Sequence, residues 1–354
     1  MINFNEQLAK NLGTRFVAES VVAGKLSDEY DFSGAKTVKV LTPTTIEMTD
    51  YTASGDNRFG TPVEMQDVVQ ELTLSQDKAF ALTVDKSNFD DQMFLKSAVK
   101  MLALQVSERA IPTMDTYILG KLAKNAGKVV GSSTAMSASN VCALISAATK
   151  ALDDAEVPNN DRTLFLSAEG YSYLKHSAEF LAVESLARDA LRRGIVGRYD
   201  NMEVVKVPSA RWPKYLNFMI VHKYAAVAPV KISDSQIHEN PPGISGSLIE
   251  GRQYYDCFVY GARCDGVYAH VDTGANKGTV VADPAITASS GAVSCSTSGA
   301  TIKYTTDGTD PRYSPSAKTG TQSDVTSAGT VVKAYAYKDA EGFYPSAVVS
   351  ATLT

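Results

Sequence analysis

The sequence has few of the residues that usually carry chemistry: its 354 residues include only four cysteines and four histidines. Neither set shows the spacing of a metal site, and no dinucleotide-binding, phosphate-binding or Gly-x-Ser-x-Gly motif occurs. We therefore expect a protein that is not an enzyme, with no catalytic residue, no cofactor-binding residue, no metal ligand and no cofactor. The histidines, which we expect on the surface or packed in the core, are His176, His222, His238 and His270.

Sulfur pairing and targeting signals are also scarce. The cysteines lie far apart, and reduced thiols in a cytoplasmic product are the direct interpretation, with a disulfide between Cys257 and Cys264 as the alternative. The first ten residues, MINFNEQLAK, lack the basic and apolar regions of a secretory signal. No apolar run of about 18 residues occurs, so we expect no membrane partner.

The charge balance argues against a nucleic-acid reader. The formal net charge is -5, without the basic footprint of a protein that recognises DNA by sequence. One basic cluster stands out among apolar neighbours, and it fits either contact with phosphate or an acidic neighbour, or a solvated helix face. Its members are Arg188, Arg192, Arg193 and Arg198.

A long helical pattern, at residues 88–127, dominates what the chain does contain. Apolar residues recur every three or four positions, acidic residues stand near the start, and Gly127 supplies the stop. Pro112 interrupts the pattern, and we expect a kink or break there. At about 1.5 Å per residue, such a helix spans roughly 50 to 60 Å, which indicates an elongated, flat molecule. The alternative is a coiled coil, but its heptad positions fall on Arg109 and Thr113, so its apolar seam fails there.

Residues before the helix alternate with the period of strands. Residues 36–85 predict a long two-stranded excursion with a turn-rich tip at 52–62. An isolated two-stranded ribbon is marginally stable in water, so we expect a neighbour to cover it, most simply another copy of the chain.

Residues after the helix mix both periods without regular order. We expect a loop of small residues at 129–138, a second helix capped by Ser139, and a short helix at 168–177. The fold class of this part is therefore α+β. The expected strands lie at 162–167, 202–207, 217–230 and 252–271.

The last quarter of the sequence changes in composition. Residues 273–278, TGANKG, are typical of a flexible linker, and residues 279–354 are rich in Ser, Thr, Ala and Gly. Short alternating segments at 301–306 and 331–337 predict strands, and no helical period is present. We expect a small all-β sandwich here.

The order of these elements resembles the major capsid protein of tailed bacteriophages. The resemblance covers residues 1–272 and includes the segments GIVGRYDNMEVVKVPSARWP and RQYYDCFVYGARCDGVYAHV. It implies the tailed-phage capsid fold with these parts: an N-terminal arm at 1–35, an extended loop at 36–85, a peripheral domain with the spine helix at 86–138 and 232–272, and an axial domain at 139–231. No catalytic residue is carried over, because that family is structural.

The resemblance also implies a function and a set of partners. The chain would self-assemble, as hexamers and pentamers, into the icosahedral head shell that encloses a phage genome. It would be located in the virion and assembled in the host cytoplasm. Further implied partners are a scaffolding protein, portal and decoration proteins, and packaged DNA without sequence-specific contact.

The tail has a resemblance of its own. The segment ATIKYTTDGTDPRYSPSAKTGT is similar to the immunoglobulin-like module at the C-terminus of chitobiase and related hexosaminidases. This implies an immunoglobulin-like sandwich at 279–354, displayed outside the shell, with a surface glycan as its ligand. Two alternatives remain at this point: a surface carbohydrate-binding or accessory protein, and the shell protein of a cellular nanocompartment.

Overall fold

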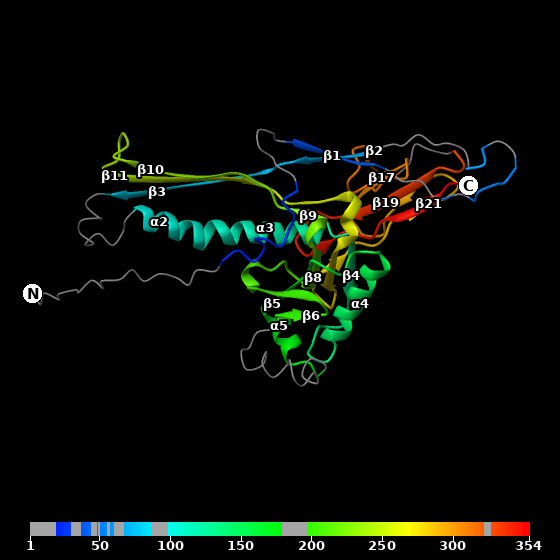
Figure 1. The fold of residues 1–354 in the computed structure, drawn as a ribbon, viewed down its shortest axis with the longest axis horizontal. Coiled ribbons are helices and arrows are strands. Elements are labelled where there is room, and N and C mark those ends of the chain that lie inside the picture. The colour runs from blue at the N-terminus through cyan, green and yellow to red at the C-terminus, as the bar shows by residue number, and fades with distance from the viewer. Residues whose placement is uncertain are drawn as a thin grey trace, which may run out of the picture.

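The computed structural model describes residues 19–29, 37–43, 48, 50–54, 57–59, 67–85, 98–178, 197–321 and 327–354. The molecule is elongated along a helical spine, with a mixed body on one side, a narrow sheet on the other and a β tail at one end (Figure 1). Most of the N-terminal arm and most of the basic cluster lie outside the described residues.

A six-stranded mixed sheet forms the centre of the body. The inner strand β8 (Leu216–His222) is buried along its whole length, because helices cover both faces of the sheet. Two neighbouring pairs are parallel, β13 with β4 and β5 with β7. The strand order is β4 (Lys128–Ser132), β13 (Val267–Asp272), β8 (Leu216–His222), β5 (Arg162–Ser167), β7 (Met202–Val207) and β6 (Arg198–Tyr199).

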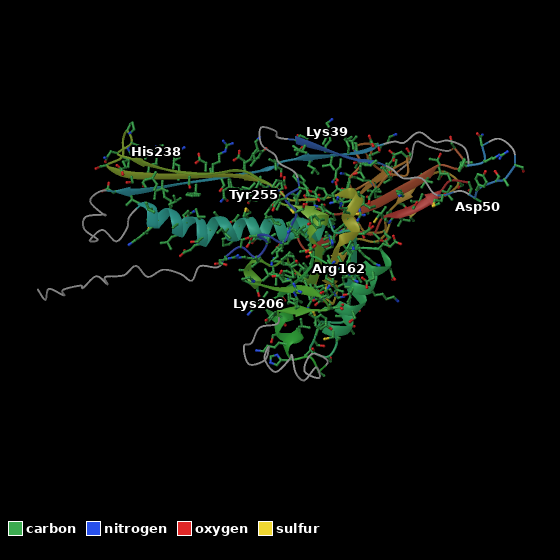
Figure 2. All side chains as sticks on the ribbon, in the orientation of Figure 1. Lys39, Asp50, Arg162, Lys206, His238 and Tyr255 are labelled. Carbon is green, nitrogen blue, oxygen red and sulfur yellow. The ribbon has the colours of Figure 1, made fainter. Side chains whose placement is uncertain are left out.

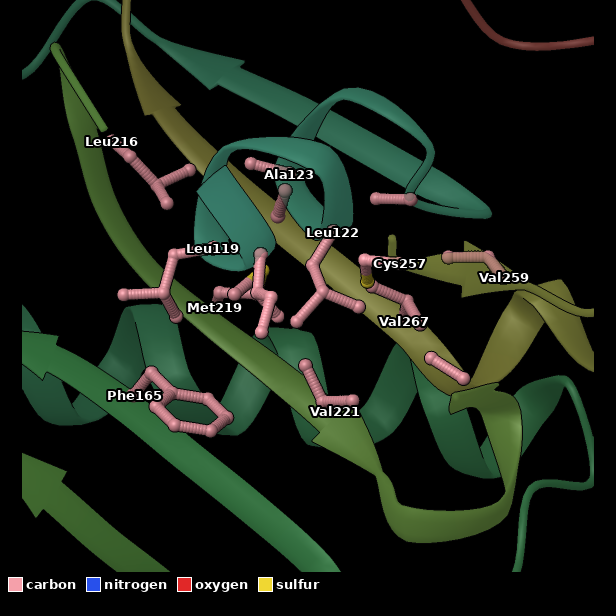
Figure 3. Packing of buried hydrophobic residues seen from close by; sticks show 14 of the residues in the cluster. Leu119, Leu122, Ala123, Phe165, Leu216, Met219, Val221, Cys257, Val259 and Val267 are labelled. Atoms are coloured by element: carbon pink, nitrogen blue, oxygen red, sulfur yellow. The ribbon is translucent and has the colours of Figure 1, made fainter. Parts of the chain in front are cut away.

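Alternate residues of this sheet build two separate cores. Phe165 and Met219 face the helix α3 (Ile111–Lys124), where Leu119 and Leu122 are fully buried (Figure 3). Their neighbours on the same strands point the other way and pack against two more helices, α4 (Val141–Asp154) and α5 (Ala168–Lys175). The period of two thus places each strand between two layers of helix.

The expected α-helical spine is confirmed from residue 98 onward. It consists of α2 (Ala98–Gln105), the π turn η1 (Val106–Ala110) and α3. In the π turn the Ile111 amide donates to the carbonyl of Val106 five residues earlier. Pro112 follows directly, and it has no amide to complete an α turn, so the interruption expected there takes the form of this wider turn. We call the three segments together the spine helix.

The strands above the spine helix agree with the sequence prediction only in part. The predicted two-stranded ribbon is present, as the antiparallel pair β1 (Thr37–Pro43) and β2 (Asp67–Thr73). The strand β3 (Gln76–Asp85) leaves this ribbon and pairs with β11 (Gly246–Tyr255), which also pairs with β10 (Val230–Glu239). This three-stranded sheet, the blade, lies along α2 (Figure 1). The sequence period could not reveal it, because β11 lies far away in the sequence.

Short elements complete the body. Strands β9 (Ala226–Val227) and β12 (Phe258–Val259) pair with each other. Three 3-10 turns connect longer elements: η2 (Ser209–Arg211), η3 (Lys223–Ala225) and η4 (Gly261–Gly266). The loop expected at 129–138 is wrong in its first part, because β4 gains its strand conformation by pairing with β13. Asn140, not Ser139, precedes the second helix.

The tail, residues 279–354, is all-β where it is described, and it has a core of its own that includes Ile302 and Val332. A four-stranded sheet runs in the order β18 (Lys318–Thr319), β17 (Thr301–Thr305), β19 (Val331–Tyr337) and β21 (Val349–Thr352). Two further pairs are β14 (Thr279–Val280) with β20 (Phe343–Tyr344), and β15 (Ala285–Ile286) with β16 (Val293–Ser294).

The connection between body and tail is held at several atoms. The Thr273 amide donates to the carbonyl of Ser132 at 2.8 Å, and the Gly278 amide donates to that of Asp272 at 3.0 Å. The Lys277 ammonium lies 2.6 Å from the Asp272 carboxylate. The segment 273–278, expected as a linker from its composition, forms a hydrogen-bonded turn.

Candidate assembly surfaces

The base of the ribbon is attached to the body. The side-chain amide of Gln70 donates to the carbonyl of Val259 at 2.9 Å and accepts from the amide of Gly261 at 2.8 Å. Leu72 and Leu74 are buried in the same small core as Tyr260. The base of the ribbon is therefore part of the subunit.

The outer part of the ribbon exposes apolar side chains instead. Phe59 is 86% exposed and Tyr51 is 58% exposed, and the two rings meet edge to face with centroids 5.1 Å apart. Met48 and Leu41 are exposed as well. Apolar groups gathered on a projection are typical of a protein contact surface. The sequence predicted the turn at this tip but not its aromatic pair.

The blade presents a polar face and strand edges. Arg252 on β11 donates to both carboxylate oxygens of Asp77 on β3, from Nε at 2.9 Å and from Nη2 at 2.6 Å. The hydrogen bonds from Arg252 lower the pKa of Asp77. Figure 2 shows the exposed His238 near the blade's end and the buried Tyr255 at its base. In the described residues, β3 and β10 are the outermost strands, so each keeps one edge without a strand neighbour.

A buried carboxylate, Asp256, joins the blade to the spine helix. It accepts the Tyr117 hydroxyl at 2.7 Å, the Ser75 amide at 2.8 Å and the Cys257 amide at 2.8 Å. These donors come from the spine helix, the turn before β3 and the end of β11. Burial raises the pKa of Tyr117, so the phenol stays a donor. The blade and the spine helix therefore form one stiff unit.

A second buried carboxylate, Asp115, ties the N-terminal segment to the same helix. It accepts the Ser20 hydroxyl at 2.7 Å and the Val21 amide at 3.1 Å. Its ion partner is Arg211 of η2, with a nitrogen to oxygen distance of 2.8 Å. Asp115 is fully buried, so three segments far apart in the sequence meet at one charge.

A groove of about 720 Å³ lies between the blade and the spine helix. Lys78 and Tyr255 form its blade wall, Glu108 and Thr113 its helix wall, and Pro208 part of its end. Its position beside a strand edge makes it part of the surface on which a neighbour could lie.

The histidines are divided between the surface and the core. His222 and His270 are buried, and His176 and His238 are exposed. All four cysteines are free thiols, so the Cys257–Cys264 alternative is wrong. Within the described ranges, no three His, Cys, Asp or Glu side chains come together as a metal site. No helix in those ranges is both long and apolar enough to cross a membrane.

Acid should destabilise the subunit through its two buried histidines. Burial lowers the pKa of His222 and of His270, so below about pH 6.5 the unfolded chain binds protons that the folded chain does not. The free energy of unfolding should then fall with pH, by up to about 1.4 kcal/mol per pH unit for each histidine. Urea midpoints measured between about pH 7.5 and 5.5 test this.

Substitution of a single histidine provides the control. In His270 the Nδ1 atom lies 3.0 Å from the Asn217 amide nitrogen, so a proton there would face another donor. His270→Gln should reduce the slope with pH, and the exposed His176→Gln should not. Equal slopes in both variants would contradict the assignment.

The sequence missed most of the polar contacts that organise these surfaces. Asp153 at the end of α4 pairs at 2.8 Å with Arg162, whose side chain is 1% exposed. Asp115 and Arg211 carried no local signal, because they are 96 positions apart. Of the basic cluster only Arg198 is described, as an exposed residue of β6, so the two interpretations of that cluster stay open.

Comparison with solved structures identifies the fold. A protein of Mycobacterium phage Che8 superposes with a TM-score of 0.65 at 22% identity, covering 78% of this chain and 100% of that one. The capsid structure of cyanophage P-SCSP1u gives 0.60 at 13% identity, covering 77% and 94%. The head structure of Helicobacter pylori bacteriophage KHP40 gives 0.57 at 12% identity, covering 78% and 99%. The chain therefore has the phage capsid fold.

Comparison at the level of sequence gives a different result. No protein-family model matches the chain, and no curated protein sequence matches it. The solved structures that share the fold are described as phage, capsid and head structures, a structural class of protein without enzymatic activity.

Proposed function

We propose that this chain is the major capsid protein of a tailed phage and that copies of it assemble into the icosahedral head around the genome. The observation that carries the proposal is a ribbon whose base is fixed by Gln70 and whose tip exposes Tyr51 and Phe59. Such a projection gains stability when another subunit covers it. The phage capsid fold supports the same conclusion.

The parts of the fold support a division of labour within the shell. We assign residues 36–85 to the extended loop, 86–138 and 232–272 to the peripheral domain, and 139–231 to the axial domain. The strand β3 lies within 36–85, but in the blade it pairs with β11 of the peripheral domain, so the end of the proposed extended loop is joined to that domain. The strands β5 to β8 of the central sheet, with α4 and α5, then form the axial part below the spine helix (Figure 1), and β4 and β13 of the same sheet belong to the peripheral part.

The partners of the proposed shell protein are chiefly its own copies, in hexamers and pentamers. A scaffolding protein, a portal and decoration proteins belong to the same proposal. DNA would be enclosed without sequence-specific contact, which fits a net charge of -5. Assembly would take place in the host cytoplasm, where the free thiols remain reduced.

Electron microscopy of the purified protein tests the proposal. Expression, alone and together with the scaffold candidate from its source, should yield closed shells or capsomers. Only monomers in sedimentation at high concentration, with the scaffold present, would overturn it. The shell of a nanocompartment is distinguished by its contents: a packaged enzyme in native particles, instead of DNA, would favour that alternative.

Proteolysis provides a separate prediction for the ribbon tip. Residues 57–59 are exposed in the subunit, so trypsin should cut after Arg58 in free subunits. Assembled shells should resist the same digestion if a neighbour covers the tip. Mass spectrometry of the fragments at matched protein concentration is the measurement. Equal cleavage rates in both states would contradict the extended-loop assignment.

The tail would stand on the exterior of the shell as an immunoglobulin-like module. Its all-β structure and separate core support this proposal. Its sugar-binding role has less support, because none of the strongly exposed large apolar side chains in the described residues lies in the tail. Sugar recognition commonly needs an exposed aromatic surface, so the exposed side chains of the described residues do not support the carbohydrate-binding alternative.

A further inference from the structure

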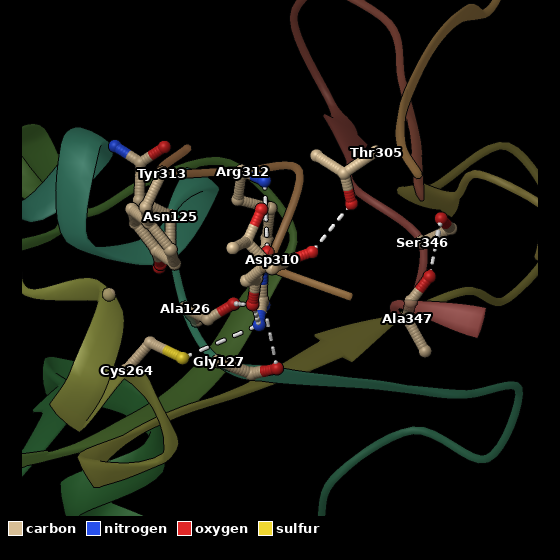
Figure 4. A network of polar contacts seen from close by, with 12 residues as sticks. Asn125, Ala126, Gly127, Cys264, Thr305, Asp310, Arg312, Tyr313, Ser346 and Ala347 are labelled. Carbon is tan, nitrogen blue, oxygen red and sulfur yellow. Dashed lines mark hydrogen bonds and ion pairs between the residues drawn. The ribbon is translucent and has the colours of Figure 1, made fainter. Parts of the chain in front are cut away.

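We infer that the tail has a second role, as a clamp on the carboxyl end of the spine helix of its own subunit. The last carbonyls of any helix lack partners within the helix. Here three successive carbonyls beyond α3 accept bonds from the tail: Asn125 from the Tyr313 hydroxyl at 2.8 Å, and Ala126 and Gly127 from Arg312 at 3.2 and 2.9 Å (Figure 4).

The tail presents these two side chains in a prepared conformation. Asp310 accepts the Arg312 amide at 2.9 Å, and its carboxylate lies 2.6 Å from the Arg312 guanidinium. The guanidinium is 9% exposed and stacks over the ring of Tyr313 at 5.3 Å. Burial by itself lowers the pKa of Arg312, but the hydrogen bond to Asp310 and the charge interactions with Tyr313, Cys264 and Asp310 together raise it, so the charge is retained. A buried cation with several acceptors is a specific contact.

The body has a socket that matches this pair. A Cβ atom at Gly261 would lie 2.9 Å from the Cβ of Tyr313, so the aromatic residue fits only against glycine. At Gly127 a Cβ atom would lie 2.2 Å from the carbonyl oxygen of Cys264. The absence of a side chain at Gly127 therefore lets η4 approach the helix end. The Cys264 sulfur accepts from Arg312 at 3.4 Å and so lies under the clamp.

A second contact fixes the orientation of the tail. Tyr344 is 4% exposed and belongs to the same core as Leu119 of the spine helix. Its hydroxyl donates to the carbonyl of Lys214 at 2.7 Å. Val280 packs on the same core. The tail therefore holds the body at two separate places, the helix end through Arg312 and Tyr313 and the core beside the central sheet through Tyr344. A decoration joined only by a flexible linker would not make these contacts.

Reactivity of Cys264 tests the clamp directly. Burial raises the pKa of this thiol to about 12, and the residue is 5% exposed. Arg312→Ala should make Cys264 react with a maleimide at least about tenfold faster in the native subunit, a factor equal to ~1.4 kcal/mol. Peptide mapping by mass spectrometry separates it from Cys142, which lies in the other core and should not change.

Two further variants complete the test. Gly261→Ala blocks the socket from the body side and should give the same acceleration, even if Arg312→Ala does not fold. Lys303→Ala removes a cation over Tyr337 inside the tail and should leave Cys264 protected. Unchanged rates of maleimide reaction at Cys264 in both Arg312→Ala and Gly261→Ala would overturn the clamp. The assay uses free subunits, so its result is independent of whether the protein builds shells.

Discussion

Asp115→Ala should destabilise the subunit by about 3–5 kcal/mol, because it leaves the guanidinium of Arg211 buried without its ion partner. The same change removes the acceptor for Ser20 and Val21 and so frees the N-terminal segment from the spine helix. The measurement is the urea midpoint of the subunit, combined with hydrogen exchange at the amide of Val21.

A double variant separates the charge from the packing. Replacing both partners, as Asp115→Leu with Arg211→Met, should cost less than Asp115→Ala alone, because no buried charge is then left over. The exposed pair Lys39–Glu71, 2.8 Å apart on the ribbon, is the matched control, and Lys39→Ala should leave the midpoint unchanged. A double variant less stable than the single one would contradict this account.

Phe165→Ala should cost about 3–5 kcal/mol through the lost burial and the cavity left behind. Phe165 is fully buried on β5, between Leu119 of the spine helix and the neighbouring strand β8 (Figure 3). The matched control is Phe59→Ala at the ribbon tip, where the ring is 86% exposed.

The two phenylalanine variants should have opposite phenotypes. Phe165→Ala should lower the urea midpoint of the free subunit, and Phe59→Ala should leave it nearly unchanged. In assembly, Phe59→Ala should reduce the yield of shells seen by electron microscopy, because the tip loses apolar contact area with a neighbour. A tip variant that assembles normally would remove the aromatic pair from the subunit interface.

The sequence predicted correctly those helices and strands in which apolar residues recur with a simple period. The strands β5, β7 and β19 have the bounds that the sequence predicted, and the predicted second helix is present as α4. These segments are short or amphipathic, and the side chains themselves carry the signal. The phage capsid fold was recognisable for the same reason, from the order of such elements.

Features made by distant segments could not be predicted in this way. The strand β4 consists of small residues and owes its conformation to β13, some 140 positions later. The pairing of β3 with β11 and the docking of Arg312 on the spine helix also join residues far apart. Composition described TGANKG correctly as polar and small, but it could not show that Asp272 holds Lys277.

The helix end at Asn125 also sets an order of events during synthesis. Tyr313, which bonds its carbonyl, is 188 residues further along the chain. At about 5–20 residues per second, the ribosome delivers that partner roughly 10 to 40 s after the helix itself. A nascent chain interrupted before Tyr313 therefore carries an unfinished spine, and the contacts at the helix end are complete only after Tyr313 has been translated.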